Sequence, residues 1–351
     1  MSEFPAALSV EIQNRWKKFA IGIQKYHDHS YARPTPLYPV VWQQGTTRLY
    51  DYVPSVPTTG KTKKKSGIPI LVIPSLVNRA YILDLLPEKS FLKFLSENGF
   101  HPFLVDWDAP GEMERNFGLS EYITQRLLPI YEFIAQKYAP PAVLGYCMGG
   151  NLALALAQLA HPKPPALALL ATPWDFQAAG MPAFTSEMAE QLMKIVSFHH
   201  EMPVDSLQTL FAALDPFGAA QKFVKFAEMD MMSESAKLFV ALEDWLSDGV
   251  PLTPKVTEDT MKGWYAQNTA VTDRWRVGDT VIHPSAIKIP TLTVLPQQDR
   301  IVSPASAAAL ASAIPGALSL TPDMGHIGMM IGRDAQTRVW EPIIRWLSDK
   351  K

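Results

Sequence analysis

The stretch VLGYCMGGNLALALAQLA, residues 143–160, holds the only cysteine among 351 residues. Gly145 and Gly149 flank Cys147 in a G-x-C-x-G pattern, between an apolar strand-like run and an apolar helix-like run. Glycines allow a sharp turn there, and a strand–turn–helix unit of this kind carries a nucleophile at its tip. A helix N-terminus also favours a thiolate. The stretch therefore predicts that Cys147 is a nucleophile, with a buried inert cysteine as the alternative.

Such a nucleophile needs a base, and the base needs a group that orients it. Asp299 lies in LPQQDRIVSP and His326 in TPDMGHIGMMIG, each after an expected strand. The carboxyl ends of parallel strands meet at one edge of a sheet, which is also the edge of Cys147. The order Cys, Asp, His predicts His326 as the base and Asp299 as the acid. Asp323 is a rival acid close to the histidine.

Backbone N–H groups are expected to stabilise the oxyanion that forms on the substrate. Met148, the residue after the nucleophile, is predicted to provide one of them. The second usually comes from a loop after an earlier strand, which here is PSLVNRAYILDLLP. Val77 is the predicted donor and Leu76 the next choice, while Asn78 and Arg79 are candidates for holding the loop in place.

Two pairs of histidines, His27 with His29 and His199 with His200, have spacings that suggest metal ligands. No carboxylate accompanies either pair convincingly. We expect them to be solvated helix ends, and the sequence predicts no metal site.

Short apolar runs alternate with helix-like stretches along most of the chain. The helix at 120–138 is expected to begin with a serine cap and to be interrupted at Pro129. The alternation predicts an α/β fold with a mostly parallel sheet and helices on both faces. Strands are expected at 68–74, 101–107, 141–146, 166–172, 290–296 and 317–322. Helices are expected at 8–27, 90–100, 120–138, 148–160, 304–314 and 334–348.

The alternation pauses over residues 177–286, which follow a mainly helical pattern rich in Met, Phe and Trp. We expect these residues to form an inserted cap over the strand ends, where ligands bind in open α/β sheets. The core is predicted over 68–176 and 287–351. Residues 1–67 are predicted to form an N-terminal segment with a helix and, at 39–54, a hairpin.

Composition excludes several classes of protein. A formal net charge of −2 and 47% hydrophobic residues favour a globular protein over one that binds nucleic acid or an anionic membrane. A single cysteine excludes an internal disulfide and suits a reducing compartment. The sequence has no apolar run typical of a signal peptide or a membrane span, so the expected location is the cytoplasm. The basic stretch at 58–67 is expected to be a solvated hairpin tip, with a polyanion contact as the minor alternative.

Several stretches together resemble polyhydroxyalkanoate (PHA) synthases, nearest the short type that works with a separate partner subunit. The elbow alone is less specific, because dienelactone hydrolases also use a G-x-C-x-G turn with Cys, Asp and His. The cap matches more weakly, and ALEDWLSDGVPLTP would correspond to the family's tryptophan-containing cap segment. The matching stretches are VIPSLVNRAYILDLLP, LVDWDAPGEMERNFGLSEYI, LGYCMGGNLAL, LLATPWDF, DRIVSP and MGHIGMMIG.

The resemblance implies an alpha/beta-hydrolase fold and an acyltransferase. Cys147 would carry the acyl group, with His326 as its base and Asp299 as a third member that also helps to activate the incoming hydroxyl. The implied substrates are (R)-3-hydroxyacyl-coenzyme A thioesters, and the products are free CoA and a growing polyester. No cofactor is implied beyond the CoA thioester substrate. A partner subunit or a homodimer is implied, as is association with polymer granules.

A thiol suits this chemistry. Attack by cysteine on a CoA thioester gives another thioester, so the acyl group stays activated, whereas serine would give a less reactive oxygen ester. A cap that excludes water would then favour a hydroxyl acceptor. One competing interpretation is a cysteine hydrolase or thioesterase that uses water. Another is a non-catalytic subunit that binds a partner or granules through an apolar cap, although the Cys, Asp and His order argues against it.

Overall fold

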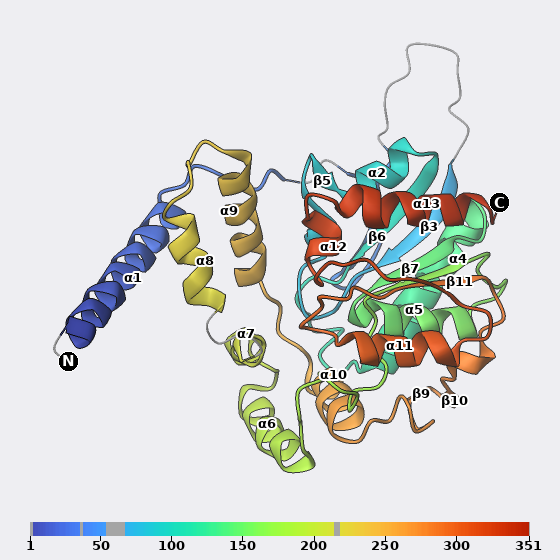
Figure 1. Ribbon diagram of the computed structural model, residues 1–351. Coiled ribbons are helices and arrows are strands. Elements are labelled where there is room, and N and C mark those ends of the chain that lie inside the picture. The colour runs from blue at the N-terminus through green and yellow to red at the C-terminus, as the bar shows by residue number, and fades with distance from the viewer. Residues whose placement is uncertain (1–2, 36–37, 54–66, 214–217, 351) are drawn as a thin grey trace, which may run out of the picture. The chain divides into compact units, whose positions relative to one another are not determined.

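The structure is a computed structural model that describes residues 3–35, 38–53, 67–213 and 218–350 (Figure 1). The chain falls into two compact units. The large unit comprises Leu37–Leu207 and Gly249–Lys351, and the small unit comprises Met1–Pro36 and Gln208–Asp248. The expected basic tip at 58–67 lies outside the described residues except for Gly67.

Within its described residues, the large unit is built on an eight-stranded sheet in the order β1-β2-β6-β3-β7-β8-β11-β12. The strands from β6 to β12 pair in parallel. The central ones are short runs of apolar residues buried along their whole length, as is typical of strands with helices over both faces. The strands of this sheet are β1 Val40–Gln44, β2 Thr47–Asp51, β3 Ile68–Ile73, β6 Phe100–Asp106, β7 Ala142–Tyr146, β8 Leu167–Leu170, β11 Thr291–Val294 and β12 Leu318–Leu320. Two short ribbons pair β4 Asp84–Leu86 with β5 Lys89–Ser90, and β9 Arg276–Val277 with β10 Thr280–Val281.

Helices cover both faces of this sheet. Figure 1 shows α2 and α13 on one side of β3, β6 and β7, and α5 and α11 on the other. The predicted alternation and the predicted fold class are confirmed, because each expected strand and helix of the core is present. The helices of the core are α2 Phe91–Glu97, α3 Leu119–Tyr122, α4 Leu128–Lys137, α5 Met148–Leu159, α11 Pro304–Ala313, α12 Gly328–Ile331 and α13 Glu341–Ser348. Shorter helical turns are η1 Ala80–Leu83, η2 Ile123–Leu127, η4 Pro284–Ala286 and η5 Gln336–Trp340.

The predicted hairpin is present and extends the main sheet. β1 and β2 pair antiparallel, and β2 continues antiparallel onto β6. Leu49 and the other inward-facing residues of β2 are buried, so the hairpin contributes to the core of the large unit. The helix predicted from the same N-terminal segment belongs to the small unit instead.

The helix predicted at 120–138 differs in two details. It begins at a Gly118 cap, whose N–H donates to Glu121 Oε2 at 2.7 Å, and not at a serine cap. Pro129 does not interrupt it, because a π-helical turn at Ile123–Leu127 precedes α4 and leaves the proline in the first turn of α4, where no helical N–H is needed. The expectation for Pro129 was wrong because the wider turn was not visible in the residue pattern, and the expected serine cap was wrong because Gly118 and Glu121 start the helix earlier.

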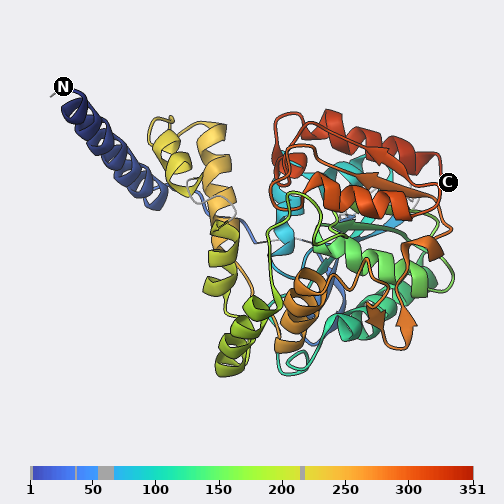
Figure 2. The same cartoon turned by 60° about the horizontal axis from the view of Figure 1, so that its bottom comes forward.

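The mainly helical pattern of residues 177–286 is confirmed, and its helices are divided between the two units. In the large unit, α6 Ser186–His199 packs against η3 Glu258–Ala266, a π-helical segment that continues α10 Pro254–Thr257. Figure 2 shows α6 and this segment side by side. α7 Val204–Ala212 spans the boundary between the units.

The small unit joins α1 Glu3–His27 to α8 Gly218–Phe226 and α9 Glu234–Ser247. Lys25 Nζ donates to the Ala227 carbonyl at 2.7 Å, and Tyr26 Oη donates to Asp244 Oδ1 at 2.7 Å. Phe226 and Val240 form the buried centre, against which the Tyr26 ring packs. The predicted boundary of the cap at 177 and 286 stays a prediction, since the segment contributes to both units.

None of the helices in the described ranges has the length and apolarity needed to cross a membrane.

Candidate active site

Cys147 sits between β7 and α5 in a strained backbone conformation, with φ +56° and ψ −131°. Non-glycine residues rarely adopt such angles, and they do so where the surrounding structure imposes them. The Cys147 N–H donates to the Leu170 carbonyl of β8 at 2.8 Å, and the Cys147 carbonyl accepts from Gly150 at 2.9 Å. The side chain is half-buried. This is the geometry of a nucleophile elbow.

Gly145 and Gly149 are required by close packing. A Cβ on Gly145 would collide with the backbone of Gly150, and one on Gly149 would collide with the carbonyl of Ile73 in β3. Any side chain at these positions would push α5 away from the sheet. The glycines of the G-x-C-x-G pattern therefore set the position of the thiol.

Asp299 and His326 meet as the sequence order predicted. His326 Nδ1 donates to Asp299 Oδ2 at 2.7 Å, and both residues are buried. The other oxygen, Asp299 Oδ1, accepts from the N–H groups of Ile301 at 2.8 Å and Val302 at 2.9 Å. Three hydrogen bonds thus fix the carboxylate, and the carboxylate fixes the tautomer of the imidazole.

Cys147 also acts on the His326 imidazole electrostatically. Burial lowers the pKa of His326, but the interactions with Cys147 and the hydrogen bond to Asp299 outweigh it and raise the pKa to about 10. The structure therefore joins His326 to Asp299 by a hydrogen bond, with Cys147 close enough to affect the pKa of the imidazole, and the raised pKa favours an imidazolium at neutral pH.

The rival residues lie elsewhere. Asp323 is exposed and accepts from Gln298 Nε2 at 2.8 Å, so the acid bonded to His326 is Asp299. His29 uses both ring nitrogens on the backbone of Met231 and Tyr31, and His200 ends α6 in a left-handed conformation. Within the described ranges, no group of three or more His, Cys, Asp or Glu is arranged to hold a metal ion.

The two predicted oxyanion donors differ in what surrounds them. Met148 is the first residue of α5, where N–H groups have no acceptor within their own helix. The Val77 N–H donates to Ser75 Oγ at 3.2 Å. Val77 would have to exchange this bond for one to a substrate oxygen, and its role stays a prediction.

An ion-pair cluster holds the loop that carries Val77. Arg79 pairs with Asp108, and Arg48 Nη1 lies 3.1 Å from the other carboxylate oxygen. Burial acts to raise the pKa of Asp108, but the hydrogen bonds from Arg79 and the Ala109 N–H lower it below its ordinary value. At the start of the loop, Trp107 Nε1 donates to the Pro74 carbonyl at 3.1 Å. The expectation that Arg79 anchors the loop agrees with these contacts.

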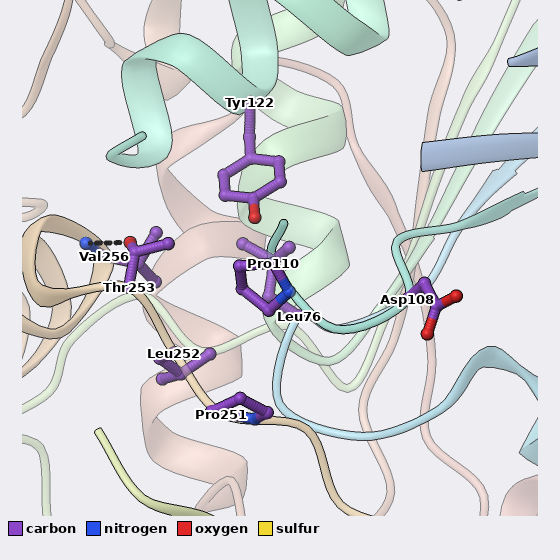
Figure 3. Close-up of a pocket in the computed structure, with 8 residues that line it drawn as sticks. All are labelled: Leu76, Asp108, Pro110, Tyr122, Pro251, Leu252, Thr253 and Val256. Carbon is purple, nitrogen blue, oxygen red and sulfur yellow. Dashed lines mark hydrogen bonds between the residues drawn. The ribbon is translucent and has the colours of Figure 1, made fainter. Parts of the chain in front are cut away.

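A small hollow lies beside this loop (Figure 3). The Tyr122 hydroxyl points towards Pro110 and Leu76, whereas the carboxylate of Asp108 is turned away from the others. The wall is mostly apolar, and Leu76 connects it to the predicted oxyanion loop. The lining residues are Leu76, Asp108, Pro110, Tyr122, Pro251, Leu252, Thr253 and Val256.

Sequence reasoning assigned no role to Asp108 or Tyr265. Asp108 lies two residues after the end of β6, which is a signal that could have found it. Tyr265 lies in the π-helical segment η3, and π-helical turns are frequent at functional sites. Burial and then the charge of Cys147 raise the pKa of Tyr265 above its ordinary value.

Family comparisons agree with this geometry. A family profile for the alpha/beta hydrolase fold matches residues 68–332, and the chain belongs to this family. An esterase from Thermogutta terrifontis has the same fold, with a TM-score of 0.53, 16% identity, and coverage of 89% of this chain and 97% of the esterase.

The resemblance predicted from the motifs is confirmed more specifically. A profile for the poly-beta-hydroxybutyrate polymerase (PhaC) N-terminus matches residues 38–95. The chain is 27% identical to the poly(3-hydroxyalkanoate) polymerase subunit PhaC of Synechocystis sp., over 89% of this chain and 84% of that protein. It is 24% identical to the subunit of the same name from Haloferax mediterranei, over 89% of this chain and 63% of that protein. The chain thus spans less than two thirds of the haloarchaeal relative.

Proposed function

We propose that this chain is an acyltransferase that polymerises (R)-3-hydroxyacyl-CoA into polyhydroxyalkanoate. The observation that carries the proposal is Cys147 at a strained strand–helix turn together with the hydrogen-bonded pair of His326 and Asp299, in a protein similar to PhaC subunits over most of its length. The fold alone would allow many acyl-transfer and hydrolytic reactions.

In the first half-reaction, the Cys147 thiolate attacks the thioester carbonyl carbon of the substrate. The N–H groups of Met148 and Val77 stabilise the oxyanion. The bond from the carbonyl carbon to the CoA sulfur breaks, and the His326 imidazolium gives its proton to the departing CoA thiolate. The products are an acyl-cysteine, neutral His326 and free CoA.

In the second half-reaction, a 3-hydroxyl group of another acyl unit or chain attacks the acyl-cysteine. His326 accepts the hydroxyl proton, with Asp299 keeping the imidazole in the correct tautomer. A new ester bond forms, the bond from the carbonyl carbon to Cys147 Sγ breaks, and the thiolate beside an imidazolium returns. No cofactor takes part in either step, and the CoA thioester is the only activated reactant.

The proposed setting is the cytoplasm at the surface of polymer granules, with a partner subunit or a second copy of the chain. This part rests on the resemblance to PhaC subunits. Sedimentation of the purified protein, alone and with polymer particles, tests it.

The central experiment incubates purified protein with (R)-3-hydroxybutyryl-CoA, measures CoA release with a thiol reagent, and determines the mass of the acyl product. The expected result is CoA release with oligomeric or insoluble ester. CoA release with only free 3-hydroxybutyrate would replace the proposal with a thioesterase, in which water is the acceptor. Absence of CoA release with several acyl lengths would contradict catalysis by this chain alone.

A further inference from the structure

Tyr146 is the last residue of β7 and directly precedes the predicted nucleophile. Its side chain is 3% exposed. Tyr146 Oη donates to the backbone carbonyl of His326 at 3.2 Å. Its ring also faces the imidazole of His326, with ring centroids 5.0 Å apart and planes inclined by 36°. One buried side chain therefore contacts both the backbone and the ring of the predicted base.

These contacts restrain His326 where its own segment does not. His326 lies in the connection from β12 to α12, between Gly325 and Gly328. Glycines permit a wide range of backbone conformations, so this segment needs outside contacts to hold one of them. The hydrogen bond from Nδ1 to Asp299 fixes one edge of the imidazole, but it leaves the ring free to pivot about that bond. The carbonyl bond and the ring contact from Tyr146 oppose such a pivot.

We propose that Tyr146 is a positioning residue that keeps the His326 imidazole aimed at Cys147. The inference rests on the proposed function, since it concerns the same acyl transfer. It couples the base to the elbow, because the strand that ends in Tyr146 also sets the position of the thiol. A displacement of the Cys147 thiol would therefore be accompanied by a displacement of the His326 imidazole, and the reverse.

The restraint persists over the working pH range. Burial raises the pKa of the Tyr146 hydroxyl well above its ordinary value, and the charges of Cys147 and Asp299 raise it further. The phenol therefore stays protonated and remains a donor to the His326 carbonyl.

The test uses Tyr146→Phe, which removes the hydrogen bond but keeps the ring. Cys147 is the only cysteine, so the rate of alkylation by iodoacetamide reports this thiol alone. At pH 6 the thiolate depends on a correctly placed imidazolium, and we expect the rate to fall on the order of tenfold. At pH 10.5 a thiol ionises without help, and the rate should stay within about twofold of the unsubstituted protein.

The matched control is Tyr131→Phe. Tyr131 is also buried, and its Oη donates at 2.8 Å to the carbonyl of Pro162, which lies beyond the end of α5 opposite to Cys147. This variant loses the same type of bond, so it should lose similar stability but keep the pH 6 rate. Equal pH 6 rates for Tyr146→Phe and Tyr131→Phe would overturn the inference.

Two further variants keep the outcomes distinct. Tyr146→Leu removes the ring as well, and it should lower the pH 6 rate further than Tyr146→Phe; it also serves if the phenylalanine variant does not fold.

His326→Gln sets the baseline rate of alkylation for a Cys147 without its base. If the unsubstituted protein reacts no faster than His326→Gln at pH 6, the cysteine–histidine pair itself fails, and the proposed function falls together with this inference. A fast unsubstituted protein with an equally fast Tyr146→Phe overturns the role of Tyr146 alone.

Discussion

The two sides of the candidate site are built differently. On the acid–base side, Asp299 accepts three hydrogen bonds and His326 is buried. On the oxyanion side, the Val77 N–H is occupied by Ser75 Oγ, and the loop is anchored by ion pairs of Asp108, whose side chain is 28% exposed.

The difference indicates which half of the proposed chemistry is ready before substrate binds. His326 and Asp299 already make their mutual hydrogen bond, so this pair needs no rearrangement. The second oxyanion donor needs a bond exchanged, so part of the binding energy of the substrate would go into completing that half. Each prediction below tests one side against the other.

The largest effect is expected from Cys147→Ala. Without a nucleophile, acyl transfer should fall by a factor on the order of 10⁴ or more, as measured by CoA release. The thermal unfolding midpoint should change little, because the side chain is small and half-buried. Cys147→Ser sharpens the result, since an oxygen ester formed at this position should accumulate without chain growth. Turnover close to that of the unsubstituted protein in Cys147→Ala would refute the proposed mechanism.

The acid–base side is tested next with Asp299→Asn. The substitution preserves shape but removes the acceptor that fixes the imidazole tautomer, so CoA release should fall about 10²- to 10⁴-fold. The Asp299 interactions raise the pKa of His326, which is about 10 in the unsubstituted protein. His326 should therefore lose its proton at a lower pH in this variant, and alkylation of Cys147 should slow most between that lowered pKa and about pH 10, where only the unsubstituted protein keeps the imidazolium.

Asp323→Asn is the control for this variant. Its carboxylate is bonded to Gln298 and not to His326, so CoA release should stay within about twofold. A large loss of CoA release in Asp323→Asn would show that Asp323, and not Asp299, is the acid.

The oxyanion side should respond more weakly. Arg79→Met breaks the ion pair between the loop and Asp108, and we expect kcat to fall about fivefold, because a partly exposed ion pair contributes little. Arg48→Met is the matched control, since it removes the other partner of Asp108 and leaves the loop contact intact. Equal losses of kcat in Arg79→Met and Arg48→Met would show that the effect does not depend on the contact between the loop and Asp108.

The smallest effect is expected from Ser75→Ala. It releases the Val77 N–H from its hydrogen bond, and acyl transfer should change by less than about threefold. A tenfold loss measured by CoA release would instead identify the Ser75 hydroxyl as the oxyanion donor, and the prediction for Val77 would then be wrong.

The parts of the fold that could be predicted from the sequence are those that depend on patterns of neighbouring residues. Buried parallel strands are continuous apolar runs, and Cys147, Asp299 and His326 each follow such a run, so their shared edge followed from strand order. The turn chemistry around Cys147 was equally local.

The remaining features depend on residues that are distant in the chain. The wider π-helical turn before Pro129, the pairing of Arg79 and Arg48 with Asp108, and the contact of Tyr146 with His326 all arise from packing between elements. Likewise, α8 and α9 read as part of a cap, but they bury their apolar faces together with α1. No short window of sequence contains these partners.

The construction of the small unit also has a consequence for biosynthesis. Lys25 finds its hydrogen-bond acceptor, Ala227, only after 202 further positions. At ribosomal speeds of about 5–20 residues per second, α1 would wait on the order of 10–40 seconds for α8 to emerge. Trp16, Ile12 and Leu8 of that helix remain exposed even in the folded chain. The nascent chain would therefore expose both the small-unit face and these apolar side chains of α1 throughout most of its translation.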